Sequence, residues 1–253
     1  MDDIFRKKLI KVAVVGRNLE DLLPMLKMFP CEIVEESPDL VISHGGDGAL
    51  LGAERRYPDI PKCPLRDHRE NPKCPRHSEI STLQKLFSGQ LKPVMLSRLV
   101  AEKAGSESIR GINEILMDRT CKASAIRYRI WVDGELFRPQ VVADSLIIST
   151  PFGSTGYFQS IARGNFTKGL GLAFNNAMDL MGFAVIGEDS KVTVELLRGP
   201  AVMGADNDSR MIPLESGDSF TVHAEHNTTP LYGLEIFRCM DCYDLRKNGV
   251  KNR

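Results

Sequence analysis

Two patterns of apolar residues divide the chain near residue 95. Before that point, continuous apolar runs at 11–15 and 40–43 stop at glycine or polar residues, which is typical of strands buried on both faces. Between them, residues 19–29 place apolar side chains at helical spacing after two acids, which predicts a helix. With a further short strand at 31–34, this alternation predicts an α/β domain with a Rossmann-like parallel sheet over residues 1–95.

Residues 61–80 interrupt this pattern. They contain four prolines, several charges and no apolar period, so we expect a loop there. A short helix is predicted to follow over residues 80–87.

After residue 95 the apolar positions alternate with polar ones. Residues 126–132 place every second apolar side chain on one face, and Asp133-Gly134 offers a two-residue hairpin turn. Residues 96–225 are therefore predicted to form a mainly β domain. The further expected elements are strands at 141–149, 191–197, 200–203, 219–223 and 231–237, and a helix near 173–181.

The segment from Asp39 to Leu51 carries the most informative chemistry. An apolar strand pattern ends at Gly45-Gly46-Asp47-Gly48, and a helical pattern starts directly afterwards. Glycines let backbone N–H groups approach an anion and a helix N-terminus favours negative charge, so this arrangement indicates phosphate binding. Because the Asp47 carboxylate would repel phosphate, its natural uses are accepting a proton from an attacking hydroxyl or holding a metal ion. An ordinary turn is the alternative interpretation.

A second strand pattern ends in a cluster of glycines and hydroxyls at Thr150–Tyr157. Its hydroxyl and backbone N–H groups could donate to the phosphates and ribose of a nucleotide, and Asp144 at the head of the strand could contact ligand hydroxyls or amides. Upstream, Asn113-Glu114 precedes an apolar run and could bind a ribose diol. Simple polar turns are the alternative for these segments.

Taken in this order, the three segments resemble the signature of the NAD kinase family. That signature is a Gly-Gly-Asp-Gly turn, an Asn-Glu pair and a Thr-Pro-Thr-Gly-Ser-Thr-Ala-Tyr stretch, in which Phe152 and Gly156 here replace a threonine and the alanine. The likeness extends to Asp206, where the family has an Asp-Gly turn between two late strands. The chain departs from the family at 62–67, in place of a Gly-Ile-Asn segment, and at 162–164, in place of a Gly-Gly pair.

The resemblance implies two domains with an active site between them, and a C-terminal segment, residues 226–253, that returns to the first domain. It implies that Asp47 accepts a proton and that the turn glycines contact phosphate, namely Gly45, Gly46 and Gly48. The implied NAD-binding residues, partly supplied by a neighbouring subunit, are Asp47, Gly48, Asn113, Glu114, Asp144, Thr155, Gly156, Tyr157 and Ser160.

The activity implied by the resemblance is transfer of a phosphoryl group to the adenosine 2′-hydroxyl of NAD, which gives NADP. The family uses ATP, or in some members polyphosphate, with a divalent cation such as Mg²⁺, and works as a homodimer or homotetramer. Two alternatives stay open: a lipid or sphingoid-base kinase of the same superfamily, and a dinucleotide-binding sensor without catalysis.

Composition limits the other function classes. The 33 lysines and arginines balance the 33 acids, so net charge does not indicate nucleic acid or an anionic membrane as a partner. No apolar stretch approaches the length that spans a bilayer, and the charged first residues do not resemble a secretion signal. We therefore expect a cytoplasmic protein.

Six cysteines in such a chain indicate free thiols or a metal site. Cys239 and Cys242 form a Cys-x-x-Cys pair, and Cys63 and Cys74 lie in the proline-rich segment. If residues 226–253 return to the first domain, these four could bind a structural Zn²⁺ tetrahedrally, with His68 and His77 as alternative ligands. Scattered thiols without metal are the other interpretation.

Overall fold

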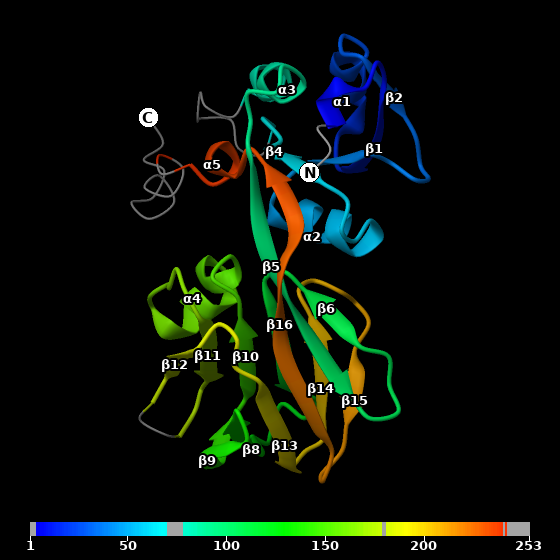
Figure 1. The fold of residues 1–253 in the computed structure, drawn as a ribbon. Coiled ribbons are helices and arrows are strands. Elements are labelled where there is room, and N and C mark those ends of the chain that lie inside the picture. Colours follow the sequence, from blue (N-terminus) through cyan, green and yellow to red (C-terminus); the bar gives the residue numbers. More distant parts are fainter. Residues whose placement is uncertain (1–3, 70–77, 179–180, 240, 242–253) are drawn as a thin grey trace. The chain divides into compact units, whose positions relative to one another are not determined.

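The computed structural model describes residues 4–69, 78–178, 181–239 and 241 (Figure 1). It divides into two compact units, of which one comprises residues 1–95 and 229–253 and the other residues 96–228. The chain passes from one unit to the other within β5 (Pro93–Lys103) and again within β16 (Ser219–Tyr232).

The first unit is built on a parallel sheet. Its strand order is β2, β1, β3, β4, followed by the end of β16, where Leu231 pairs with Lys62. The strands are β1 (Ile10–Gly16), β2 (Cys31–Ile33), β3 (Leu40–His44) and β4 (Lys62–Leu65). The helical elements are η1 (Ile4–Arg6), α1 (Leu19–Leu26), α2 (Asp47–Arg56), α3 (Glu79–Phe87) and α5 (Leu234–Phe237).

Successive residues of a strand face opposite sides of a sheet, and this decides which helix covers which face. Val41 packs with Ala13 and Ala53 of α2 in one cluster. Its neighbours in β3 pack instead with the apolar residues of α1 and α3 in the larger core of this unit. The sheet is therefore covered on both faces, which explains why β3 is apolar without interruption and buried at every position.

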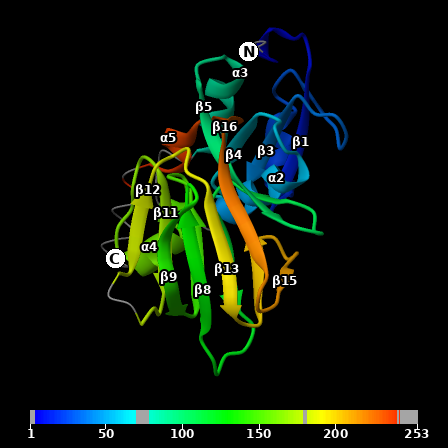
Figure 2. The same ribbon diagram turned by 60° about the horizontal axis from the view of Figure 1, so that its bottom comes forward.

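The second unit contains two mainly antiparallel sheets (Figure 2). One sheet has the order β9, β8, β13, β16, with β5 next to β16 and β6 next to β5; the other has the order β12, β11, β10, β7, β14, β15. One large apolar cluster draws residues from both sheets, with Tyr128 fully buried in it.

The remaining elements of this unit are β6 (Ile109–Gly111), β7 (Glu114–Arg119), β8 (Ile126–Val132), β9 (Glu135–Ala143), β10 (Ser145–Ser149), η3 (Gly153–Thr155), α4 (Tyr157–Ala162), β11 (Leu170–Asn175), β12 (Phe183–Ile186), β13 (Val192–Arg198), β14 (Ala201–Ala205) and β15 (Ile212–Leu214). The predicted fold class, an α/β part followed by a mainly β part, is confirmed. Among the described residues, no helix is both long and apolar enough to cross a membrane.

The prediction of a loop throughout 61–80 is wrong, because β4 lies within this segment. This strand did not match the apolar pattern of a buried strand because it begins with a charged residue, Lys62. Lys62 is fully buried, and its Nζ lies 2.5 Å from Glu54 Oε2 of α2 and also donates to two backbone carbonyls. A buried lysine is tolerated only when it is paired and hydrogen-bonded. The sequence does not reveal a partner eight positions away on another element.

The helix expected near 173–181 is also wrong, because residues 170–175 form the buried strand β11 between β10 and β12. The single strand expected over 141–149 is two strands, which meet at Asp144. The strand expected over 231–237 ends at Tyr232. There Gly233 adopts a left-handed conformation (φ 74°), which glycine reaches without steric cost, and α5 begins at the next residue.

Candidate functional site

The glycine turn of the first unit connects β3 directly to α2. Gly45 has φ 141°, a value that a side chain would strain, and its N–H donates to the Leu65 carbonyl at 2.8 Å. Gly46 precedes the first helical residue without a side-chain cap, and that first helical residue is Asp47. The turn therefore leaves backbone N–H groups at the start of a ten-residue helix without a capping side chain.

Two arginines converge on Asp47, whose side chain is 39% exposed. Arg238 Nη2 lies 3.4 Å from Asp47 Oδ1, and Arg66 Nη2 lies 3.9 Å from the same oxygen. Arg66 is held in place because its Nε donates to the Phe237 carbonyl at 3.0 Å and its guanidinium stacks 4.0 Å from the centre of the Phe237 ring. Two cations and a helix N-terminus at one point make a site suited to an anion such as phosphate.

Sequence reasoning missed both arginines. The arginines that do lie near the turn in the sequence, Arg55 and Arg56, are exposed near the C-terminal end of the same helix. Arg238 is 191 positions from Asp47 in the sequence, and no local pattern marks it. Arg66 directly follows β4, so recognising that strand would have placed it at the sheet edge where the glycine turn lies.

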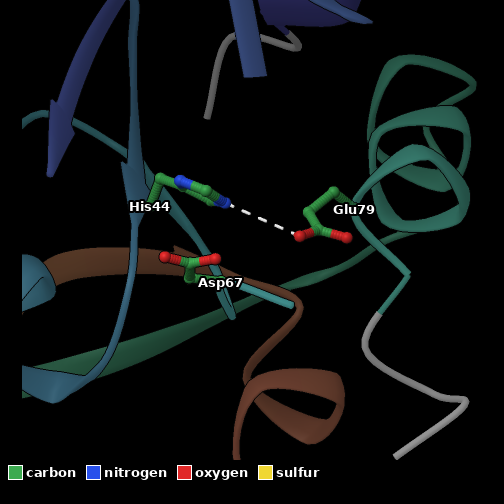
Figure 3. A group of neighbouring side chains, drawn as sticks. All are labelled: His44, Asp67 and Glu79. Atoms are coloured by element: carbon green, nitrogen blue, oxygen red, sulfur yellow. Dashed lines mark ion pairs between the residues drawn. The ribbon is translucent and has the colours of Figure 1, made fainter. Parts of the chain in front are cut away.

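A second polar group of the first unit contains His44, Asp67 and Glu79 (Figure 3). His44 is the last residue of β3, Asp67 follows β4, and Glu79 is the first residue of α3. All three are buried, and one donor atom from each lies within 4.8 Å of the others. Sequence reasoning did not single out either acid.

Hydrogen bonds set the charge state of these acids. Burial raises the pKa of Asp67, but donors from the Arg69 N–H and the Asn18 side chain outweigh it, and its pKa is lowered. Burial likewise opposes the lowering of the Glu79 pKa, which hydrogen bonds from its own backbone and from His68 produce. The same hydrogen bond from His68 to Glu79 raises the pKa of His68. Both carboxylates are therefore ionised at neutral pH.

In the second unit, the Asn113-Glu114 segment is held by Asp206, which follows β14. The Asp206 carboxylate accepts the backbone N–H groups of Ile112 at 2.9 Å, Asn113 at 2.8 Å and Glu114 at 3.1 Å. Three N–H donors to one ionised carboxylate make a strong local clamp. The Asp206 position noted in the family comparison therefore has a supporting role that sequence reasoning did not assign.

The hydroxyl-rich segment packs against the same turn. Thr150 Oγ1 donates to the Ile112 carbonyl at 2.6 Å, and the Thr150 N–H donates to the Asn113 carbonyl at 2.9 Å. A Cβ on Gly153 would lie 2.2 Å from the Asn113 carbonyl oxygen, so only glycine permits this approach. A Cβ on Gly156 would lie 4.0 Å from both Asn113 Nδ2 and Glu114 Oε2. The structure thus brings together two segments that the sequence placed 36 or more positions apart.

The other predicted dinucleotide contacts occupy the exposed surface of this segment. Thr155, Gly156, Tyr157 and Ser160 are exposed at the junction of η3 and α4. Ser160 Oγ donates to the Tyr157 carbonyl at 2.7 Å, and Tyr157 is 39% exposed. These side chains are accessible to a ligand.

Asp144 is not part of this group within one chain. It lies before the first residue of β10, whereas Thr150 follows the last, so the five residues Ser145–Ser149 separate them. Its Oδ1 pairs with Arg119 Nη1 at 2.7 Å. The expected contribution of Asp144 from a neighbouring subunit stays a prediction.

The structure describes two of the four cysteines that were predicted to bind zinc. Cys74 and Cys242 lie outside the described residues. Cys63 is fully buried in the core of the first unit, where burial and then Glu235 raise the pKa of its thiol to about 12, and Cys239 is also buried. The zinc prediction at these cysteines is therefore untested.

No family model matches the chain. One similar curated relative is the NAD kinase of Clostridium beijerinckii, which is 33% identical over 127 residues, 47% of this chain and 44% of that enzyme. The match thus spans less than half of the relative's length. The chain is similar to NAD kinases over about half of its length. The resemblance that the three motifs indicated is confirmed.

Solved structures of NAD kinases share this fold along most of the chain. Yeast NADH kinase complexed with NADH matches with a TM-score of 0.75 and 16% identity, over 98% of this chain and 90% of that one. The NAD kinase of Archaeoglobus fulgidus in complex with ATP matches with a TM-score of 0.74 and 18% identity, over 95% and 100%. At 16% and 18% identity, these matches show a shared fold only.

Proposed function

We propose that the protein is a kinase that transfers the γ-phosphoryl group of ATP to the adenosine 2′-hydroxyl of NAD and so forms NADP. The observation that carries the proposal is the placement of Asp47 at the N-terminus of α2, behind two glycines and beside two arginines. The similar proteins bear the name NAD kinase, and two solved neighbours hold NADH and ATP.

The first unit would bind the triphosphate. Phosphoryl transfer requires mainly alignment and charge stabilisation, and the N-terminus of α2 together with Arg66 and Arg238 would supply both; Gly45 would act by shaping the turn, since its N–H donates to the Leu65 carbonyl. Mg²⁺ would arrive bound to the phosphate oxygens, since it prefers oxygen ligands and keeps several waters. Because the two guanidinium groups already approach Asp47, they would screen the repulsion between its carboxylate and the incoming phosphates.

The second unit would bind the acceptor. Asn113 is 7% exposed, and its Oδ1 is buried with no hydrogen-bond partner among the described residues. A buried acceptor of this kind gains most from a new donor, such as a ribose hydroxyl. Glu114 beside it would accept from the second hydroxyl of the same diol, and Thr155, Gly156, Tyr157 and Ser160 would contact the rest of the dinucleotide.

In the reaction, Asp47 would orient the 2′-hydroxyl and accept its proton as the oxygen attacks the γ-phosphorus. The bond between that phosphorus and the β,γ-bridging oxygen breaks, and ADP leaves. General-base help of this kind is typically worth about 10²–10⁴-fold in rate. If the chain assembles as a homodimer or homotetramer, a neighbouring subunit would add its Asp144 to the NAD site. We also propose that the protein is cytoplasmic.

The test uses purified full-length chain, NAD, ATP and Mg²⁺, with NADP formation measured enzymatically. Asp47→Asn should keep NAD affinity and lose about 10²–10⁴-fold in turnover. Asp39→Asn, the same change at a surface carboxylate of the first unit, should leave turnover unchanged. NAD binding without turnover in the unaltered protein would identify a sensor instead, and phosphorylation of a long-chain base but not of NAD would identify a lipid kinase. Parallel reactions with NADH and with polyphosphate decide the preferred acceptor and donor.

A further inference from the structure

We propose that His44, Asp67 and Glu79 form a binding site for a divalent transition metal of the zinc class. The site lies wholly within the first unit and uses none of the residues that the proposed kinase activity requires (Figure 3). It is also distinct from the cysteine set, since its donors are one imidazole and two carboxylates. The proposal rests on geometry and not on the proposed function.

The His44 ring is oriented by a hydrogen bond to the backbone. Its Nδ1 lies 2.6 Å from the Arg17 carbonyl oxygen, so Nδ1 must carry a hydrogen and donate. In the neutral ring, Nε2 then carries no hydrogen and has a lone pair that can bind a metal. A histidine ligand is typically held in this way, with one ring nitrogen donating to a carbonyl and the other facing the metal.

The Nε2 atom of His44 lies in a buried space next to a carboxylate. The His44 ring is 1% exposed, and among the described residues Nε2 makes no hydrogen bond; its nearest ion-pair contact is Glu79 Oε1 at 3.6 Å. Two electron-rich atoms buried together without a proton or cation would repel each other. A protonated imidazole would approach the carboxylate to about 2.7–2.9 Å, which is much shorter than the distance found. A metal ion between the two atoms accounts for both the orientation and the spacing.

The distances suit such an ion. Ligand atoms about 2.1 Å from a tetrahedral metal lie about 3.4 Å from one another. The Nε2–Oε1 distance of 3.6 Å is close to this value, and the three donor atoms all lie within 4.8 Å of one another. Small side-chain rotations therefore bring all three into coordination.

The neighbouring hydrogen bonds orient the two carboxylates. Asn18 Nδ2 donates to Asp67 Oδ2 at 2.6 Å, and the Arg69 N–H donates to Asp67 Oδ1 at 2.9 Å. His68 donates to Glu79 Oε1 through its backbone N–H at 3.1 Å and contacts the same oxygen through Nδ1 at 2.8 Å. Partners of this kind fix ligating carboxylates in metal sites.

The donor set selects the class of metal. An imidazole nitrogen with two carboxylates suits zinc, cobalt, manganese or iron, whereas Mg²⁺ and Ca²⁺ prefer oxygen alone. Three protein ligands leave a coordination position for water. Because His44 ends β3, Asp67 follows β4 and Glu79 begins α3, the ion would hold these three segments together directly before the glycine turn.

The test is a titration of the metal-free full-length chain with Co²⁺ alone, followed by visible absorption, with Zn²⁺ competition and a thermal melt. We expect one equivalent to bind with the weak bands of nitrogen and oxygen ligands, Zn²⁺ to displace it, and the melting temperature to rise. His44→Gln and Glu79→Gln should each weaken Co²⁺ binding more than about 100-fold, since loss of an outer partner alone costs about 10–100-fold. The matched controls His226→Gln and Glu36→Gln should bind as the unaltered chain does.

An intense thiolate-to-cobalt band at the first equivalent would overturn the proposal and assign the metal to cysteines. Equal affinity in the His44 and Glu79 variants, or no saturable binding in the unaltered chain, would also overturn it. Circular dichroism confirms that each variant is folded. If His44→Gln is not folded, the comparison of Glu79→Gln with Glu36→Gln decides.

Discussion

The polar groups around Asp47 and around Asn113 are built by different means. In the first unit, side chains from distant segments converge on the start of α2, with Arg66 and Arg238 near Asp47. In the second unit, the backbone provides the arrangement, because the turn at Asn113 is fixed by amide hydrogen bonds to Asp206 and by close contact with Gly153.

This difference has a consequence for substitutions. A site made of side chains can lose one charge while the chain stays folded, so its changes should affect ligand binding and catalysis. A site made of backbone contacts cannot be altered without disturbing the strands that carry it, so its changes should lower stability as well. Substitutions at the residues of each kind of site test this contrast.

Gly153→Ala should cost about 3 kcal/mol in the free energy of unfolding, the upper end for overpacking, because the new Cβ would meet the Asn113 carbonyl oxygen at 2.2 Å. Chemical denaturation would measure this, and NAD binding should weaken in parallel. The control is Gly52→Ala, where a Cβ has no neighbour within 4 Å; there a helical alanine should add about 0.5–1 kcal/mol. Equal stability of the two variants would contradict the close-contact account.

Asp206→Asn should destabilise the second unit by about 2–3 kcal/mol, since a carboxylate that accepts three backbone N–H groups is replaced by an amide that offers one acceptor. Hydrogen exchange by mass spectrometry should show faster exchange at residues 112–114. The same change at Asp189, whose side chain is 85% exposed, should leave that exchange unaltered. If residues 112–114 exchange no faster in Asp206→Asn, the hydrogen bonds between the neighbouring strands alone fix this turn.

Arg66→Lys should raise the KM for ATP about tenfold, or about 1.4 kcal/mol, and leave the KM for NAD unchanged. Lysine keeps the charge but loses the stacking on Phe237 and the fixed donor geometry of the guanidinium. Steady-state kinetics measure both constants, and Arg55→Lys on the exposed surface of α2 is the control. A rise in the KM for NAD instead would assign Arg66 to the acceptor.

The smallest expected effect is at Asp39, which pairs with Lys7 at 2.6 Å on the surface of the first unit. The hydrogen bond from Lys7 lowers the pKa of Asp39 below its value in the unfolded chain, about 3.9. The stabilisation is therefore present above about pH 4 and is lost as the pH falls through the lower, folded-state pKa. Asp39→Asn should cost less than about 1 kcal/mol at pH 7, and this cost should shrink as the pH is lowered below 4, as measured by thermal melts across this range.

Elements with a strong local pattern were predictable. The apolar run of β3, the glycine turn and the start of α2 were all expected where they occur, because a strand buried on both faces and a glycine-bounded helix each have a local signature. The Asp133-Gly134 hairpin was equally clear, and both residues have positive φ, of 54° and 85°.

Elements that depend on a distant partner were not predictable in this way. The β4 strand contains a lysine that is acceptable only because Glu54 neutralises it. The strand β11 resembled a helix, because a buried strand with apolar residues at consecutive positions has no period of its own.

The sequence by itself determined the order of the motifs, the change from an α/β to a β pattern, and the identity of Asp47 as the carboxylate of the glycine turn. Only the tertiary structure decided which charges stand near it, and that His44, Asp67 and Glu79 share one buried space. The physical reason is that φ/ψ preferences and apolar periodicity act over a few residues. The compensation of a buried charge, in contrast, depends on groups that the fold brings from anywhere in the chain.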